Sequence, residues 1–205
     1  MHRQIAFFDF DGTITYKDTL LEFIRHSKGN MLFYTGFLKN SPWIVAYKLG
    51  LVSNQVAKEK VLEFFFRNQT LETFQDQCHE FTDSRLPSLL RPKALSEMAK
   101  LKARGFKIVV VSASPENWII SWANQANADL VATRLQTEQR TEGGEQKTIL
   151  TGKILGANCF GEEKVRRIRQ LYALEDYQTI LCYGDSKGDL PMLQLSTRSF
   201  YKPFR

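Results

Sequence analysis

The sequence predicts an α/β protein in which helices cover both faces of a mostly parallel β-sheet. Three apolar runs rich in β-formers, IAFFDF, KIVVVSAS and TILCYGD, are typical of buried parallel strands. Helical patterns separate these runs, and this alternation indicates right-handed crossovers within one sheet. The chain has 205 residues, of which 43% are hydrophobic, so it is long enough for one core with a small subdomain.

The first predicted strand, IAFFDF, is followed by a long segment without a buried strand pattern. Residues 17–90 show helical patterns only, and this length is too great for a loop. We therefore expect a helical insertion after the first strand. The next helix is predicted over PKALSEMAKLKARG, because Pro92 suits a first helical turn and Gly105 suits a helix end.

The second half of the chain continues the alternation. PENWIISWANQA repeats apolar residues at helical spacing, and GEEKVRRIRQLYAL begins with acids where the helix dipole favours them. Between these helices, β-rich runs flank Gly143-Gly144 over residues 130–155, which predicts a β-hairpin. The C-terminal SFYKPFR is compatible with a last strand.

Composition narrows the cellular setting and the partners. The net charge of +6 suits an anionic ligand or surface, but the chain has neither a nucleic-acid-binding motif nor a dense basic run, so no nucleic acid is expected. The three cysteines are scattered, which favours reduced thiols over a zinc site or disulfides. MHRQIAFFDF lacks the apolar region of a signal peptide, and we expect a cytoplasmic protein.

Polar residues follow each apolar run, at the point where ligands bind in open α/β sheets. These residues are Asp9, Asp11, Ser112, Asp185 and Asp189, and Gly12 and Ala113 lie beside them and offer backbone N–H groups. Four carboxylates in one small site require a compensating charge, and an oxygen-only ligand set favours Mg²⁺. A serine hydroxyl, backbone N–H groups and the nearby Lys164 would suit phosphate oxygens, so the set is typical of phosphoryl transfer.

Each of these residues also has a structural interpretation when it is taken alone. A DxD pair is often a turn, Lys164 could be a solvated helix residue, and Asp189 could cap the helix DLPMLQL. The order of the four segments along the chain is what favours a functional site.

Together, DFDGT, VVVSAS, GEEKV and GDSKGD resemble the four motifs of the haloacid dehalogenase superfamily of phosphohydrolases. The resemblance implies a Rossmann-like three-layer core over residues 1–16 and 91–205, with a helical C1 cap over 17–90. The small cap and LTGKILGANCFGEEKV are similar to subfamily IB, the branch of phosphoserine phosphatase-like enzymes. GDSKGDLPML, with Gly188 in place of the usual Asn, resembles a subgroup that includes a phosphatidylglycerophosphate phosphatase.

For the chemistry, the resemblance implies a Mg²⁺-dependent phosphomonoester hydrolase. Asp9 would be the nucleophile that forms an aspartyl-phosphate, and Asp11 the general acid and base. Asp9, Asp11 through its backbone carbonyl, and Asp185 would bind Mg²⁺, with Asp189 supporting the site. The second Asp of the first motif favours a phosphatase over a dehalogenase.

For the substrate, the resemblance implies phosphoryl contacts from Ser112 and Lys164 and from backbone N–H groups near Gly12 and Ala113. Asp18 lies near the position of an acidic substrate contact in phosphoserine phosphatases, and it is equally a candidate N-cap for TLLEF. Those enzymes bind the substrate carboxylate with an arginine of the cap. This chain has no equivalent, because no arginine lies between Arg25 and Arg67, and a lysine cannot reproduce the two-pronged contact.

The expected substrate is a small phosphorylated metabolite such as phosphoserine, or a lipid head-group phosphate. A phosphotransferase and a non-catalytic phosphoryl-binding regulatory domain remain as alternative functions.

The insertion also carries an unusual stretch, because residues 23–58 contain no Asp or Glu but five Lys or Arg. Its segment MLFYTGFLKNSPWIVAYKLGLV is aromatic and aliphatic, and Lys39 and Pro42 argue against a membrane span. One interpretation is peripheral contact with an anionic membrane. The other, which we favour from sequence, is a cap with its own core and lysines that face solvent.

Overall fold

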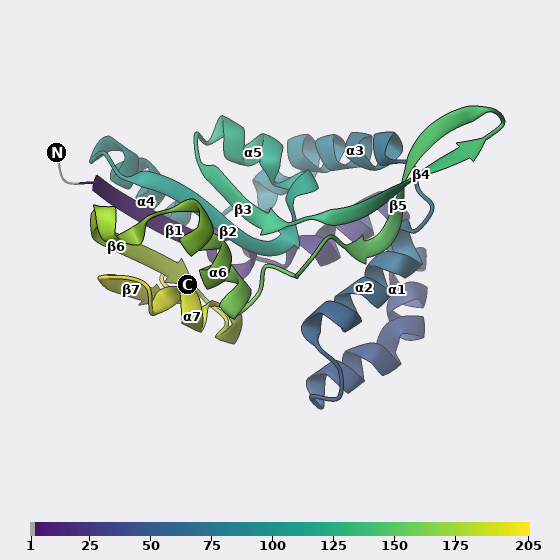
Figure 1. Ribbon diagram of the computed structural model, residues 1–205, viewed down its shortest axis with the longest axis horizontal. Helices are drawn as coiled ribbons and strands as arrows, with labels where there is room; N and C mark the ends of the chain where they lie inside the picture. Colours follow the sequence, from purple (N-terminus) through teal and green to yellow (C-terminus); the bar gives the residue numbers. More distant parts are fainter. Residues whose placement is uncertain (1–2) are drawn as a thin grey trace.

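The computed structural model describes residues 3–205, so residues 1–2 of the predicted core region lie outside the described residues (Figure 1). Its centre is a five-stranded sheet of order β3-β2-β1-β6-β7, in which every neighbouring pair is parallel. The strands are β1 (Arg3–Asp9), β2 (Lys107–Pro115), β3 (Asp129–Thr133), β6 (Tyr177–Gly184) and β7 (Arg198–Tyr201). The predicted α/β class is therefore confirmed, and β7 is the last strand that SFYKPFR allowed.

The central strand β1 separates two hydrophobic clusters. Ala6 and Phe8 point to one face of the sheet, while Ile5 and Phe7 point to the other. The first face is covered by α4 (Pro92–Ala103) and α5 (Ile120–Gln125), and the second by α6 (Glu162–Leu171) and α7 (Leu190–Leu193). The alternation of side chains along a buried strand thus produces the three layers.

The predicted hairpin is correct in kind but begins later than expected. Residues 129–133 form β3 at the edge of the main sheet, where they pair with β2. The antiparallel hairpin consists of β4 (Leu135–Glu142) and β5 (Glu145–Ile154), which extend away from the sheet (Figure 1). The difference has a physical reason, because Val131, Ala132 and Thr133 are buried in the main sheet, whereas the following segment alternates polar residues.

Residues 17–90 are helical, as predicted. They form α1 (Thr19–Lys48), α2 (Asn54–Phe66), α3 (Leu71–Glu80) and short helical turns over 81–89, and α1 is interrupted at Gly29. The chain enters and leaves this insertion through adjacent segments, because Thr15 bridges Leu90 and the N–H of Arg91 donates to the carbonyl of Ile14. The insertion is therefore joined to the sheet by two neighbouring connections.

The insertion and the sheet share one hydrophobic cluster. The ring of Phe23 in α1 lies 5.5 Å from the rings of Phe66, Phe74 and Phe81, measured between centroids. Phe23 also stacks on Trp118, which follows β2, with 4.6 Å between the ring centroids. This packing fixes the start of α1 beside the carboxyl ends of the strands. Within residues 3–205, no helix has both the length and the apolar character required to cross a bilayer.

Candidate active site

The carboxyl ends of β1, β2 and β6 meet at one edge of the sheet and bring the predicted residues together. Asp9 is the last residue of β1, Ser112 lies near the end of β2, and Asp185 follows β6. Because β1 lies between β2 and β6, these residues are neighbours although the chain separates them. Lys164 reaches the same place from the first turn of α6, and Asp189 from the turn before α7.

Lys164 is the buried centre of this group. Its Nζ donates to Asp9 Oδ1 at 2.6 Å, to Asp189 Oδ1 at 2.7 Å and to the carbonyl of Val111 at 2.9 Å. The side chain is 1% exposed, and its burial, which would lower the pKa of Lys164, is outweighed by attraction from both carboxylates, so that the pKa is raised. Lys164 therefore remains charged and holds the two acids in place.

The same arrangement affects the two carboxylates differently. Burial raises the pKa of Asp9 well above its ordinary value, against the attraction of Lys164. For Asp189, burial is outweighed by Lys164 and by hydrogen bonds from Ser186, so its pKa is lowered. Asp189 is thus a fixed anion, whereas Asp9 is an acid whose charged form needs further positive charge.

Three carboxylates in this group could hold a metal ion. One oxygen from each of Asp9, Asp185 and Asp189 lies within 4.8 Å of the others. Gly12 allows the Asp185 side chain to lie close to the backbone after β1, because a Cβ at position 12 would lie 2.6 Å from Asp185 Oδ2. The φ of +85° at this position also favours glycine. An oxygen-only donor set with excess negative charge fits a hard divalent cation such as Mg²⁺. Arg205 also pairs with Asp185, at 2.5 Å.

Asp11 is held by the predicted Ser112 and by Thr19, which lies outside the predicted set. Its Oδ1 accepts hydrogen bonds from the N–H of Thr19 at 2.7 Å and from the hydroxyl of Thr19 at 2.6 Å. Its Oδ2 accepts from the Ser112 hydroxyl at 3.1 Å. Trp118 Nε1 donates to Thr19 Oγ1 at 3.1 Å, so the single hydroxyl proton of Thr19 is available for Asp11. The sequence offered no signal for this chain of contacts, because it depends on how α1 packs.

Asp18 fulfils its predicted capping role and also faces the site. Its Oδ1 accepts from the N–H groups of Leu20 at 2.9 Å and Leu21 at 3.2 Å, which caps α1. Asp18 lines the cavity described below, and desolvation of its carboxyl group, followed by repulsion from Asp11, raises the pKa of Asp18 to about 6.

The cavity beside these residues measures about 230 Å³. Its lining includes Asp9, Asp11, Asp18, Lys58, Lys164 and Asp189. Lys58 comes from α2, and its Nζ donates to the carbonyl of Ala113 at 2.9 Å and to Asn158 Oδ1 at 3.3 Å. Burial of this ammonium group lowers the pKa of Lys58. Sequence analysis did not single out Lys58, because only its position in the fold distinguishes it from the other lysines of the insertion.

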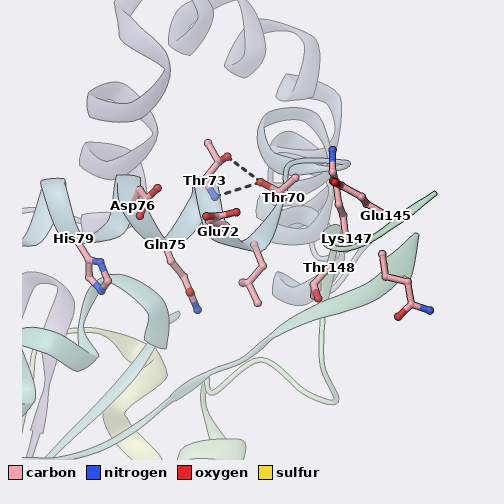
Figure 2. Close-up of a pocket in the computed structure, with 11 residues that line it drawn as sticks. Thr70, Glu72, Thr73, Gln75, Asp76, His79, Glu145, Lys147 and Thr148 are labelled. Atoms are coloured by element: carbon pink, nitrogen blue, oxygen red, sulfur yellow. Dashed lines mark hydrogen bonds between the residues drawn. The ribbon is translucent and has the colours of Figure 1, made fainter. Parts of the chain in front are cut away.

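A larger cavity of about 710 Å³ lies elsewhere, between α3 and β5. Figure 2 shows its polar lining, with Thr70 and Thr73 joined by hydrogen bonds and with His79 at one end. None of the predicted site residues lines it. The smaller cavity is therefore the candidate active site, because the buried charges converge there.

Comparison with known proteins agrees with this geometry. A family model described as haloacid dehalogenase-like hydrolase matches residues 6–194. Protein CicA of Caulobacter vibrioides is 32% identical over 97% of this chain and 85% of its own length. A probable phosphatase of Mycobacterium tuberculosis is 31% identical over 94% of this chain and 66% of its own length. A substrate-bound phosphoserine phosphatase shares the fold, with a TM-score of 0.67 at 16% identity over 98% of this chain and 86% of that chain.

Proposed function

This chain belongs to the haloacid dehalogenase-like hydrolase family and is a phosphatase-like enzyme, and on that premise we propose a Mg²⁺-dependent phosphatase that acts through an aspartyl-phosphate on Asp9. One observation carries the proposal. The carboxylate of Asp9 is held by a buried lysine at 2.6 Å, and it lies within 4.8 Å of two further carboxylates. This arrangement suits a nucleophile whose charge is balanced while it approaches phosphorus.

The residues of the site divide the proposed reaction between them. Asp9 Oδ1 is bonded to Lys164, so we assign Oδ2 as the attacking oxygen. The Oδ2–P bond forms while the bond from phosphorus to the ester oxygen breaks, and Asp11 gives its proton to the leaving oxygen. In the second step, Asp11 takes a proton from water, whose oxygen attacks phosphorus and releases Asp9 and inorganic phosphate.

Three groups of the chain are available to a metal ion in this scheme. Asp9, Asp185 and the backbone carbonyl of Asp11 would hold Mg²⁺, and Asp189 would orient the site through Lys164 and the N–H of Ser186. When bound, Mg²⁺ supplies positive charge that offsets the repulsion between Asp9 and the phosphoryl oxygens. Ser112, Lys164 and the N–H groups near Gly12 and Ala113 would bind those oxygens.

The cavity suggests the class of leaving group. Asp18 and Lys58 place opposite charges from the insertion on its wall, which supports the assignment of residues 17–90 as a cap and of 1–16 and 91–205 as the core. We propose that Lys58 binds a second anionic group of the substrate. Phosphoserine and a lipid head-group phosphate both satisfy this chemistry, and the likeness to a phosphoserine phosphatase structure supports the former.

Hydrolysis of para-nitrophenyl phosphate, with and without Mg²⁺, tests the proposal. We expect Mg²⁺-dependent turnover by the wild type and a loss of at least about 10³-fold in Asp9→Asn, because the nucleophile is removed. Asp76→Asn, on the wall of the larger cavity, is the matched control and should retain activity. Turnover that survives in Asp9→Asn would refute the assignment of the nucleophile.

Two extensions separate the remaining alternatives. A panel of phosphoserine, sugar phosphates and phosphatidylglycerophosphate identifies the leaving group. Added alcohol acceptors distinguish transfer from hydrolysis, because a phosphotransferase would form a new phosphate ester. A wild type that binds phosphate but hydrolyses none of these substrates would instead indicate a regulatory domain.

A further inference from the structure

The second half of α1 is apolar on two opposite faces. One face carries Phe33 and Gly36, which are both buried, and Gly36 lies against Phe64 and Phe65 of α2. The other face carries the outer stripe, which we define as Met31, Tyr34, Leu38 and Val45 together with Leu49, the C-cap residue of α1. Successive spacings of three, four, seven and four residues place these side chains in one row along the helix. A helix that packs against the protein on one side needs a single apolar face. The second apolar face of α1 therefore needs a separate explanation.

The outer stripe faces solvent. Exposure of its members runs from 52% for Val45 to 81% for Met31, and none belongs to the two hydrophobic clusters of the described residues. The favoured expectation from sequence, that the cap buries these residues in its own core, therefore holds for one face of α1 only. A row of exposed apolar side chains of this kind marks an interaction site.

The charges around the outer stripe indicate what it contacts. No Asp or Glu occurs over residues 23–58. Lys39 and Lys48 are exposed and, at about 100° per residue, they lie on opposite borders of the stripe. Glu59 and Glu63, the first acids of α2, pair with Lys153. The stripe thus has a basic border without a competing acid, which complements an anionic surface.

The placement of α1 allows such a contact. The turn between α1 and α2 lies at the end of the helical pair that points away from the sheet and from β4–β5 (Figure 1). Leu51, in this turn, is 74% exposed and extends the apolar character past the end of α1. A flat surface can therefore meet the stripe and the turn together.

We propose that the outer stripe docks this protein on an anionic lipid bilayer, with α1 lying in the interface. The apolar side chains would enter the boundary between head groups and acyl chains, while Lys39 and Lys48 extend to the lipid phosphates. A second copy of the chain is the less favourable occupant, because a two-fold contact would bring these lysines together without a neutralising acid on residues 23–58. The proposal does not depend on the proposed phosphatase activity.

Co-sedimentation with vesicles tests this docking. At low salt we expect the full chain to bind vesicles of phosphatidylcholine and phosphatidylglycerol mixed 3:1, and to release at high salt. The double variant Leu38→Asp/Val45→Asp should bind at least about 10-fold more weakly, because acids enter the stripe. Lys39→Gln/Lys48→Gln should lose the preference for phosphatidylglycerol over pure phosphatidylcholine.

Control variants test whether any exposed Leu→Asp change weakens vesicle binding. Leu155→Asp and Leu171→Asp alter leucines that are 53% and 64% exposed but lie outside the insertion, and they should bind like wild type. Circular dichroism and hydrolysis of a soluble ester verify folding and activity separately from vesicle binding. The proposal is overturned if wild type fails to bind at low salt, or if the stripe variant binds equally. A dimer in light scattering that Leu38→Asp/Val45→Asp converts to a monomer, without vesicle binding by wild type, would assign the stripe to self-association.

Discussion

At the scale of single residues, Thr19 gives the site its most specific orienting contacts. It supplies both an N–H and a hydroxyl to Asp11 Oδ1 at the start of α1. We expect Thr19→Val to lower kcat by about 10- to 100-fold with a small change in KM, because one charge-assisted hydrogen bond to Asp11 is lost. Steady-state kinetics on a soluble phosphate ester measure both constants.

Thr19→Ser is the variant that distinguishes orientation from packing. It keeps the hydroxyl and removes only the methyl group, so we expect kcat close to wild type. Thr35→Val, at an exposed threonine of the same helix, is the matched control. If Thr19→Ser is as slow as Thr19→Val, the hydroxyl does not orient Asp11.

Asp18 makes stability depend on pH. Its pKa is raised to about 6, so the folded state holds this proton more tightly than the unfolded chain. The resulting penalty is absent below about pH 4, develops up to about pH 6 and remains above it, and solvent screening limits it to about 1 kcal/mol. Asp18→Asn keeps a capping side chain without the charge.

We therefore expect Asp18→Asn to raise Tm relative to wild type by about 2–4 °C at pH 7.5 and to have no such effect at pH 4. Thermal unfolding followed by circular dichroism at both pH values measures the difference. An equal shift at the two pH values would mean that the Asp18 carboxyl group titrates normally.

At the scale of elements, Gly36 controls how closely α1 and α2 approach. A Cβ at this position would lie 2.2 Å from Phe65 Cζ and 2.6 Å from Phe64 Cε1, so the helices would have to separate or the rings move. We expect Gly36→Ala to lower the free energy of unfolding by about 1–3 kcal/mol through overpacking. Chemical denaturation measures it, with Thr35→Ala as the exposed control, and an unchanged stability would show that the rings move freely.

Prediction of helices and strands from the sequence succeeded where one hydrophobic pattern was uninterrupted. The buried runs of β1, β2 and β6 are continuous and apolar, and each proved to be a parallel strand. It failed at β3, because LVAT adjoins the polar hairpin strand and only pairing with β2 separates them. It also overextended α5, since residues 116–118 form a 3₁₀ turn that places Trp118 in the core. In both cases tertiary packing decided the boundary.

At the scale of the whole molecule, the sheet topology explains why much of the site could be predicted. Asp9, Ser112 and Asp185 lie at or near the carboxyl ends of neighbouring strands, so a sequence pattern together with the topology rule was sufficient. Lys58, Thr19 and Trp118 could not be found in this way. Lys58 and Thr19 reach the site only because the insertion folds back over the sheet, and Trp118, which follows β2, meets Thr19 through the same contact. No local sequence pattern encodes that contact.

The three carboxylates of Asp9, Asp185 and Asp189 link metal binding to the stability of the whole chain. We expect Mg²⁺ to raise Tm of the wild type, by an amount that corresponds to about 2.7 kcal/mol at 100 times its Kd, because the ion binds the folded state preferentially. Asp185→Asn should remove most of this shift, whereas Asp176→Asn, at an exposed acid, should keep it. Scanning calorimetry with Mg²⁺ and with chelator measures the shift, and an identical gain in Asp185→Asn would place the ion elsewhere.

The stacking of Phe23 on Trp118 has a consequence for how the protein is made. The two residues are 95 positions apart, and Trp118 completes the aromatic group formed by Phe23, Phe66, Phe74 and Phe81. During synthesis, the four phenylalanines are added to the chain before Trp118, so the aromatic core of the insertion is still open on one side until Trp118 follows. A fragment excised at residues 17–90 would have the same open side. The helical insertion is thus completed by the later part of the chain, and grafting it onto another scaffold would require a replacement for the indole.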